Sequence, residues 1–329
     1  MKKYYYKSLG CLRDKKDRRD FRIAGIMQTK EIHKQVFSLE ELFPPKNQCS
    51  RGSCVSQGNA HHKERQEEVA CSARFIMALT KKLEGNKKYG AYTKNGLKIV
   101  QQYGVCKEEL YPESSPEMSW EEYIDDTKIP QKCLDDALNH KSLSYWKVNN
   151  NINEIRQVLF EKKKSIVMSM AWHKEFNSRN LVDGKILPVE FKDYVGGHCV
   201  SCCGFDDFKE LLKIKNSWGN GYGDNGYFYM SYSIFNRIVW DCFCSLDMPK
   251  ELPVDNRYGQ QRTWQSYLRE KVMAFNPWLR KKIKRLPSNR EIKGLCYGFW
   301  SYESIFDGKY NDIWLTYTKP EAIKRKLIK

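Results

Sequence analysis

Several features are missing from this sequence of 329 residues. It has no apolar run of about 18 residues, the length that spans a membrane. The basic N-terminus, MKKYYYKSLGCLRDKKDRRD, has no apolar core of signal-peptide length. We therefore expect no membrane partner and a cytoplasmic location. Internal repeats and low-complexity segments are also absent, and the content of 41% hydrophobic and 13% aromatic residues is typical of a globular protein.

The twelve cysteines are too thinly spread for the disulfide scaffold of a short secreted protein. Reduced thiols in a cytoplasm fit this spacing better. The group Cys199, Cys202 and Cys203 and the pair Cys242 and Cys244 raise the question of a metal site. They sit in apolar, strand-like runs, which is typical of small core residues. We therefore expect no metal and no other cofactor.

Positive charge is concentrated in the last quarter of the chain. The net charge is +17, and residues 250–329 hold 18 lysines and arginines against 8 acidic residues. The clusters RKKIKR and KRKLIK lie among Trp264, Trp278, Trp300 and Trp314. Basic residues interleaved with aromatics can bind nucleic acid, and a basic surface can attract an acidic partner. The alternatives are a solvated surface and a small accessory domain whose aromatics pack on the rest.

The hydrophobic periodicity changes along the chain. Helical runs come first, at 55–68, 72–83 and 97–103, with Ser72 as a cap and Gly85 as a stop. Strand patterns follow, with one helix around 152–159. The strands are expected at 142–148, 166–171, 198–205, 211–215 and 227–232. This order favours an α+β protein with two packed halves. We expect a basic extension at 1–16, a main domain at 17–249 and a C-terminal extension at 250–329.

The stretch KNQCSRGSCVS, residues 46–56, holds the first candidate functional residue. Cys54 opens a helical run, and the positive end of the helix dipole favours a reactive thiolate. Gln48 could donate a hydrogen bond from its side-chain amide. Cysteines are nevertheless common as buried hydrophobic residues, so this stretch alone leaves core packing and catalysis both open.

Two downstream stretches supply the partners that such a nucleophile needs. YVGGHCVSCCGFDD places His198 after Gly197, whose small size lets a backbone approach closely. KIKNSWGNGYGDNGYFYM places Asn216 at a strand end and Trp218 two residues later. An imidazole can accept the thiol proton, and an amide oxygen on its second nitrogen fixes the tautomer. A lone histidine at a strand start is, however, usually just a half-buried polar residue.

Together these stretches resemble the papain-like cysteine peptidases. That family has a histidine and an asparagine roughly 130–150 residues after its cysteine. Here His198 follows Cys54 by 144 residues and Asn216 follows His198 by 18. The stretch IKNSWGNGYGDNGYF is the most family-specific part, and the resemblance covers about residues 17–248. It implies a helical half and a β-barrel-like half, with the active site in the cleft between them.

The resemblance implies a role for each matched residue. Cys54 corresponds to the nucleophile, His198 to the general base and acid, and Asn216 to the residue that orients it. Gln48 corresponds to an oxyanion donor, and Trp218 to an apolar shield over the histidine–asparagine bond. Three further residues are expected to bind substrate or let its backbone approach: Gly90, Ala91 and Gly197.

The departures from the family pattern are also informative. Arg51 stands where the family often has a disulfide cysteine, so that bridge is expected to be absent. Cys49 replaces a usual glycine, Val55 replaces an aromatic residue, and Ala91 replaces a glycine of the peptide-binding loop. Only 53 residues precede Cys54, fewer than in the usual inhibitory propeptide. The resemblance thus implies that activity is not controlled by such a propeptide, or is controlled externally.

The expected function is hydrolysis of peptide bonds through a Cys-His-Asn site and a thioester, with a peptide or protein as the substrate. One alternative keeps the nucleophile but transfers the acyl group to an amine, as a transpeptidase or amide ligase does. The other is a catalytically silent protein that binds peptide or nucleic acid.

Overall fold

The computed structural model describes residues 9–16, 20, 32–113, 115–247, 254–255 and 260–261. The chain divides into two units, one of residues 1–24 and 29–246 and one of 25–28 and 247–329. Every candidate site residue belongs to the first unit. In the second, β10 (Val254–Asp255) pairs with β11 (Gln260–Gln261). The basic, tryptophan-containing stretch proposed as a nucleic-acid or acidic-partner surface lies outside the described residues.

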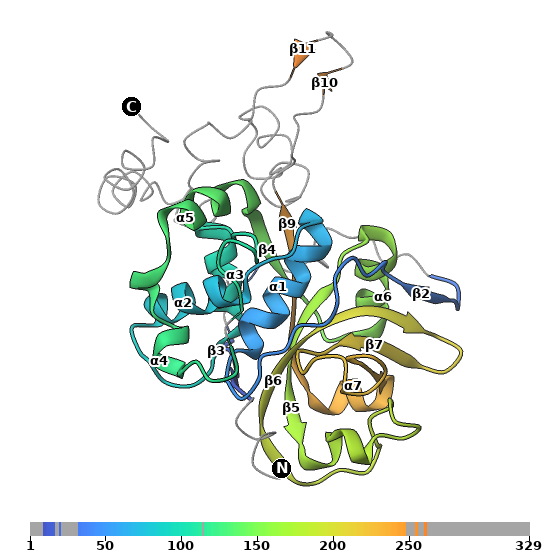
Figure 1. Cartoon of the computed structure of the whole chain (residues 1–329). Helices are drawn as coiled ribbons and strands as arrows, with labels where there is room; N and C mark the ends of the chain where they lie inside the picture. Colours follow the sequence, from blue (N-terminus) through green and yellow to red (C-terminus); the bar gives the residue numbers. More distant parts are fainter. Residues whose placement is uncertain are drawn as a thin grey trace. The chain divides into compact units, whose positions relative to one another are not determined.

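The first half of the main unit is helical (Figure 1). Its helices are α1 (Cys54–Glu67), α2 (Ala73–Glu84), α3 (Thr93–Gln102), α4 (Trp120–Tyr123) and α5 (Gln131–Ala137), with 3-10 turns at Asp126–Lys128 and Leu138–His140. The short strand β1 (Cys11–Leu12) pairs in parallel with β3 (Ala91–Tyr92). Helix α1 lies between the other helices and the sheet (Figure 1), and nearly all of its side chains are buried.

Helix α2 illustrates how local sequence sets the ends of an element. The Ser72 hydroxyl accepts a hydrogen bond from Phe75 N at 3.1 Å, as a helix cap does. Gly85 ends the helix with φ at +64°, a left-handed conformation that glycine adopts without steric cost. Phe75, Ile76 and Leu79 then face the helical core. The helix predicted over 72–83 is thus confirmed to within one residue at each end.

The second half is built on a seven-stranded sheet with the order β4-β9-β5-β6-β7-β8, in which β2 (Val36–Ser38) also pairs with β6. The other strands are β4 (Ser142–Val148), β5 (Ile166–His173), β6 (Tyr194–Asp206), β7 (Leu211–Lys215), β8 (Tyr227–Ser231) and β9 (Val239–Asp247). The registers of β5, β6, β7 and β8 are antiparallel. This half also contains helix α6 (Ile152–Lys162) and helix α7 (Tyr232–Ile238). The α+β fold with one helical and one β half is confirmed.

Helix α1 joins the two halves by packing against β6. A Cβ atom added at Gly58 would lie 3.0 Å from the Cys199 sulfur, so helix and strand are in close contact there. Cys54 and Cys199 share a buried cluster with Val55 and Val167. The N-terminus of α1 is therefore held beside the part of β6 that carries His198. Among the described helices, none is both long and apolar enough to cross a bilayer.

Candidate active site

Cys54 is the first residue of α1 and is buried. Its thiol lies among backbone groups of three neighbours, and hydrogen bonds with those of Cys199, Gly10 and Val55 lower its pKa. Burial acts in the opposite direction and is the larger effect, so the pKa of Cys54 lies above its usual range, with Cys11 raising it further. The thiolate expected from the helix dipole is therefore disfavoured in this conformation.

His198 and Asn216 lie together in the sheet. His198 Nε2 donates a hydrogen bond to Asn216 Oδ1 at 2.8 Å, and both residues are buried. The other ring nitrogen, Nδ1, has no hydrogen-bond partner in the described part of the chain. With Nε2 as the donor, Nδ1 carries the free lone pair of the neutral ring. This arrangement leaves one nitrogen of a neutral imidazole able to accept a proton.

Two tryptophans enclose the imidazole. The Trp218 ring centroid lies 4.9 Å from that of His198 at an interplanar angle of 33°. Trp172, in β5, meets His198 edge-on at 4.8 Å and Trp218 at 5.0 Å. This packing removes water from the His198–Asn216 hydrogen bond. Burial lowers the pKa of His198 to about 4, while the hydrogen bond with Asn216 acts in the opposite sense.

Gln48 is held on both ends of its side-chain amide. Its Nε2 donates to the Arg51 carbonyl oxygen at 2.7 Å, and its Oε1 accepts from the Ser217 hydroxyl at 2.6 Å. The Gln48 main-chain N–H also donates to the Ser217 carbonyl oxygen at 2.9 Å. Because Ser217 follows Asn216, these bonds tie the loop before Cys54 to the strand end that carries Asn216.

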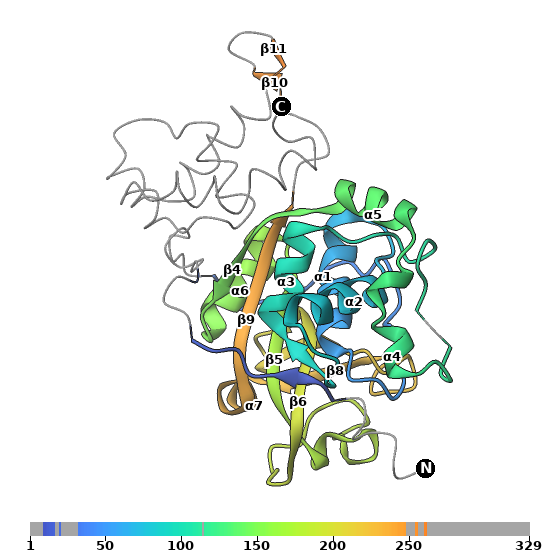
Figure 2. The same cartoon turned by 90° about the vertical axis from the view of Figure 1, so that its left-hand side faces the viewer.

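An N-terminal segment, residues 9–16, covers the Cys54 thiol. Gly10 packs on Gly52, and its carbonyl oxygen accepts a hydrogen bond from Ala91 N at 2.8 Å. The Cys11 side chain is buried and lies 3.4 Å, sulfur to oxygen, from the Thr93 hydroxyl. In Figure 2 this dark blue segment crosses β6, consistent with the close approach of Cys11 to Gly197. The residues before Cys54 thus include a segment that covers its thiol.

Lys94 binds the C-terminal part of this N-terminal segment and also Asp20. Its main-chain N–H donates to Asp14 Oδ2 at 3.2 Å, and its ammonium group forms an ion pair with Asp20 Oδ2 at 2.8 Å. The Lys15 carbonyl oxygen also accepts from the ammonium at 3.4 Å. Two separate contacts, with β3 and with the start of α3, therefore hold the N-terminal segment in place.

The expected substrate-binding residues lie around the covering segment. A Cβ atom added at Gly90 would lie 2.3 Å from the Gly10 carbonyl oxygen, and one at Gly197 would lie 2.0 Å from the Cys11 carbonyl oxygen. Both glycines thus permit a close backbone approach. Ala91 pairs with Cys11 through its backbone, so its Cβ does not prevent strand pairing at this edge. Trp218 packs on His198 and is part of its enclosure.

The departures from the family pattern around Cys54 have distinct structural consequences. Cys49 adopts a φ of +54°, a left-handed conformation that explains why a glycine is usual there. Val55 belongs to the buried cluster that contains Cys54. Arg51 makes contacts in place of a disulfide, and the eleven described cysteines are free thiols. Within the described residues, no three His, Cys, Asp or Glu side chains gather as metal ligands.

Sequence reasoning missed several parts of this site. Trp172 lies just past the end of the predicted strand 166–171, and nothing in its neighbours indicates a contact with His198. Ser217 lies inside the family-specific stretch but was given no role. The position of Gly10 and Cys11 depends on the pairing of Cys11 with Ala91, 80 residues later in the sequence. A strand of two residues is too short to show a hydrophobic pattern that predicts such a pairing.

Acid is expected to destabilise the protein partly through His198. A histidine has a pKa of about 6.5 in an unfolded chain, whereas that of folded His198 is about 4. The unfolded chain therefore binds more protons between these values, and the free energy of unfolding falls as the pH drops through this window. The difference between these two pKa values corresponds to a loss of about 3 kcal/mol in the free energy of unfolding. Urea unfolding at pH 7 and pH 4.5 measures the difference.

The His198→Ala variant should lose the part of this pH dependence that comes from His198. The remaining slope in the same direction would come from His61 and His62, whose pKa values burial also lowers. His33→Ala is the matched control, because the His33 side chain is exposed. An unchanged slope in His198→Ala would show that His198 is not held neutral by burial.

Comparison with known proteins shows the family to which the chain belongs. Residues 39–243 match the sequence model described as papain family cysteine protease. An uncharacterized peptidase C1-like protein of Acanthamoeba polyphaga mimivirus is 24% identical over 243 residues, which cover 67% of this chain and 76% of that protein.

Solved structures share the fold. Xylellain, a cysteine protease from Xylella fastidiosa, is 26% identical with a TM-score of 0.62, and the match covers 76% of this chain and 99% of xylellain. Procathepsin B of Trypanosoma congolense is 13% identical with a TM-score of 0.52, covering 74% and 87% of the two chains, and shows the fold alone. The sequence match spans more than half of the chain and contains Cys54, His198 and Asn216. This chain belongs to the papain family of cysteine proteases.

Proposed function

We propose that this protein hydrolyses peptide bonds with Cys54 as nucleophile, His198 as general base and acid, and Asn216 as the residue that orients His198. The observation that carries the proposal is the buried hydrogen bond from His198 Nε2 to Asn216 Oδ1, with Nδ1 left without a partner among the described residues. A neutral imidazole held in this tautomer is suited to accept a thiol proton.

Acylation begins with transfer of the Cys54 thiol proton to His198 Nδ1. The sulfur then forms a bond to the carbonyl carbon of the scissile peptide, and the carbonyl π electrons move to oxygen. When the tetrahedral intermediate collapses, the carbon–nitrogen bond breaks and the leaving amine takes the proton from the imidazolium. The product on the enzyme is a thioester of Cys54.

Deacylation reverses the roles of the same groups. His198 accepts a proton from water while the water oxygen attacks the thioester carbon. The second tetrahedral intermediate collapses with breakage of the carbon–sulfur bond, the sulfur recovers the proton, and a carboxylic acid is released. Asn216 stabilises the imidazolium in both halves, because its amide oxygen accepts from Nε2 throughout.

Gln48 and the Cys54 main-chain N–H are the proposed oxyanion donors. Gln48 suits this role because Ser217 and Arg51 already hold its amide, so little ordering remains when charge develops. Loss of one such donor costs on the order of 3 kcal/mol of transition-state stabilisation. Gly90 and Ala91 would pair with an extended peptide along the edge of β3 that β1 occupies in this structure.

Labelling with an epoxysuccinyl peptide, a thiol-directed electrophile, tests the nucleophile. We expect one label per chain, on Cys54, and none on the Cys54→Ala variant, which should also lack peptide hydrolysis. Cys49→Ala is the matched control, because Cys49 is a partly exposed thiol close to the site and should not affect labelling. Equal labelling of several cysteines would count against an activated Cys54.

The products identify the acyl acceptor. Mass spectrometry of a cleaved peptide, with and without an added amine, should find the free carboxylic acid in both cases. If the main product were instead an amide of the added amine, the reaction would be acyl transfer and not hydrolysis.

A further inference from the structure

The loop before the nucleophile closes on itself at Arg51. Arg51 N donates to the Gln48 carbonyl oxygen at 3.2 Å, and Gln48 Nε2 donates back to the Arg51 carbonyl oxygen at 2.7 Å. The orientation of the Gln48 amide therefore depends on the position of the Arg51 main chain. Cys49, within this turn, has a left-handed φ, so the turn is held against a local conformational cost.

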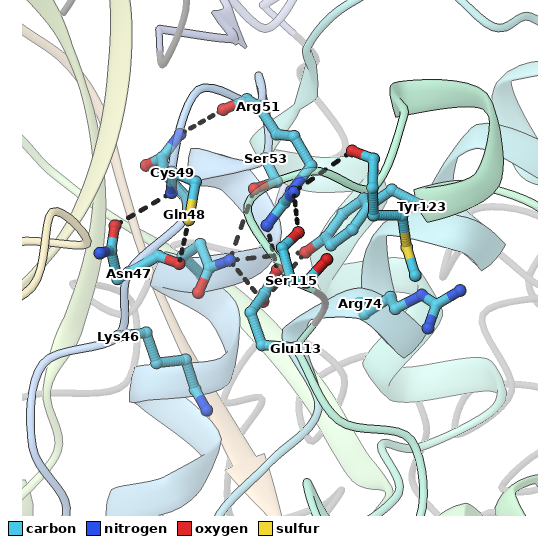
Figure 3. A network of polar contacts seen from close by, with 12 residues as sticks. Lys46, Asn47, Gln48, Cys49, Arg51, Ser53, Arg74, Glu113, Ser115 and Tyr123 are labelled. Carbon is cyan, nitrogen blue, oxygen red and sulfur yellow. Dashed lines mark hydrogen bonds and ion pairs between the residues drawn. The ribbon is translucent and has the colours of Figure 1, made fainter. Parts of the chain in front are cut away.

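The Arg51 side chain anchors this loop to a separate part of the chain. Its guanidinium donates to the Ser115 carbonyl oxygen at 3.1 Å and the Met118 carbonyl oxygen at 3.5 Å, and pairs with Glu113 at 3.4 Å. It also lies 4.8 Å from the centre of the Tyr123 ring. Figure 3 shows the side chain reaching from the loop toward Glu113, Ser115 and Tyr123. With 2% of its surface exposed, Arg51 is a buried charge satisfied by several partners at once.

Glu113 extends the anchor to the helix that carries the nucleophile. Its Oε2 accepts from Gln57 Nε2 at 2.9 Å and from the Tyr123 hydroxyl at 3.1 Å. Gln57 lies one turn after Cys54 in α1, and its main-chain N–H donates to the Ser53 carbonyl oxygen at 3.1 Å. One carboxylate therefore connects the loop of Gln48 with the first turn of α1.

We propose that Arg51 is a positioning residue whose guanidinium, clamped on Glu113 and residues 115–118, holds the Gln48 amide in place for the oxyanion. It touches no reacting atom and acts through Gln48. The inference rests on the proposed function, since it assigns Gln48 the oxyanion role. The resemblance to papain-like peptidases implies that a disulfide cysteine often stands at this position, and here the buried contacts of Arg51 restrain the loop.

The test separates this role from a general structural one. In Arg51→Met, kcat for peptide hydrolysis should fall about tenfold to a hundredfold, because a misplaced oxyanion donor is a transition-state defect. KM should change less than about twofold, because ground-state binding does not use that donor. Alkylation of Cys54 by iodoacetamide forms no oxyanion, so its rate should remain that of the wild type.

A double-mutant cycle gives a second readout. If Arg51 acts through Gln48, Arg51→Met should lower kcat by less than about twofold in a Gln48→Ala background. Arg51→Lys should give the same pattern with a smaller loss of kcat, since a lysine retains the charge but not the forked geometry. This variant replaces Arg51→Met in the experiment if Arg51→Met does not fold. Arg74→Met is the matched control, because Arg74 also lies over a tyrosine ring, that of Tyr111 at 4.3 Å, but its guanidinium donates to the Glu122 carbonyl oxygen at 3.2 Å.

Three results would overturn the inference. The first is an unchanged kcat in both Arg51 variants. The second is a loss of the same size for hydrolysis and for alkylation. The third is an additive loss of kcat in the Gln48→Ala background. The absence of any Cys54-dependent hydrolysis in the wild-type chain would instead reject the proposed function itself.

Discussion

Gly10→Val is expected to raise kcat/KM for peptide hydrolysis at least about tenfold. A Cβ atom at position 10 would lie 2.3 Å from the Gly52 carbonyl oxygen and 2.7 Å from the Gly52 Cα, and a backbone cannot move aside as a flexible side chain can. The clash needs to cost only about 1.4 kcal/mol to shift the population of the uncovered state tenfold. Initial rates on an unstructured peptide, compared with wild type, measure the change.

The rate of epoxysuccinyl labelling of Cys54 should rise by the same factor, since both reactions need an uncovered thiol. Lys16→Val is the matched control, because it places the same side chain in the same N-terminal segment at an exposed position. If Gly10→Val left both rates at the wild-type value, covering by this segment would not limit access to Cys54.

His198→Ala is expected to lower kcat by about a hundredfold to ten-thousandfold, the range typical for loss of a positioned general acid and base. Asn216→Ala should have a smaller effect, about tenfold to a hundredfold. The imidazole would stay enclosed by Trp172 and Trp218 but would lose the acceptor that fixes its tautomer. Steady-state kinetics on the full-length chain, with and without Gly10→Val, give both values.

His173→Ala serves as the matched control for these variants. It removes an imidazole from the same strand as Trp172, and its ring packs on Phe191, outside the proposed catalytic group. Its kcat should stay within about twofold of wild type. A comparable loss in His173→Ala, or none in His198→Ala, would contradict the proposed roles.

The candidate catalytic residues could be predicted because their chemistry is specific to a few side chains. Cysteine, histidine and asparagine occur in short stretches rich in glycine and small residues, and the strand and helix patterns around them are local. Helix α2 and strands β4 and β7 were predicted for the same reason, since their apolar periodicity lies within the elements themselves and the caps of α2, Ser72 and Gly85, directly adjoin it.

The position of the N-terminal segment could not be predicted in this way. Strand β1 has two residues, and its partner β3 also has two, so neither has a periodic pattern. Their pairing depends on the close approach of Gly10 to Gly52 and Gly90, which are far away in the sequence. The Arg51 clamp has the same character, because Glu113 and Ser115 lie in an irregular polar stretch whose sequence indicates no partner.

The sequence by itself determined which side chains are present and in what order, and that was enough to indicate a nucleophile, its base and the residue that orients the base. Only the tertiary structure decided the protonation state of the candidate nucleophile, Cys54. The helix dipole favours a thiolate at Cys54, but burial beneath Gly10 and Cys11 raises the thiol pKa above its usual range. The physical reason is that desolvation depends on which atoms exclude water from a group, and those atoms come from distant parts of the chain.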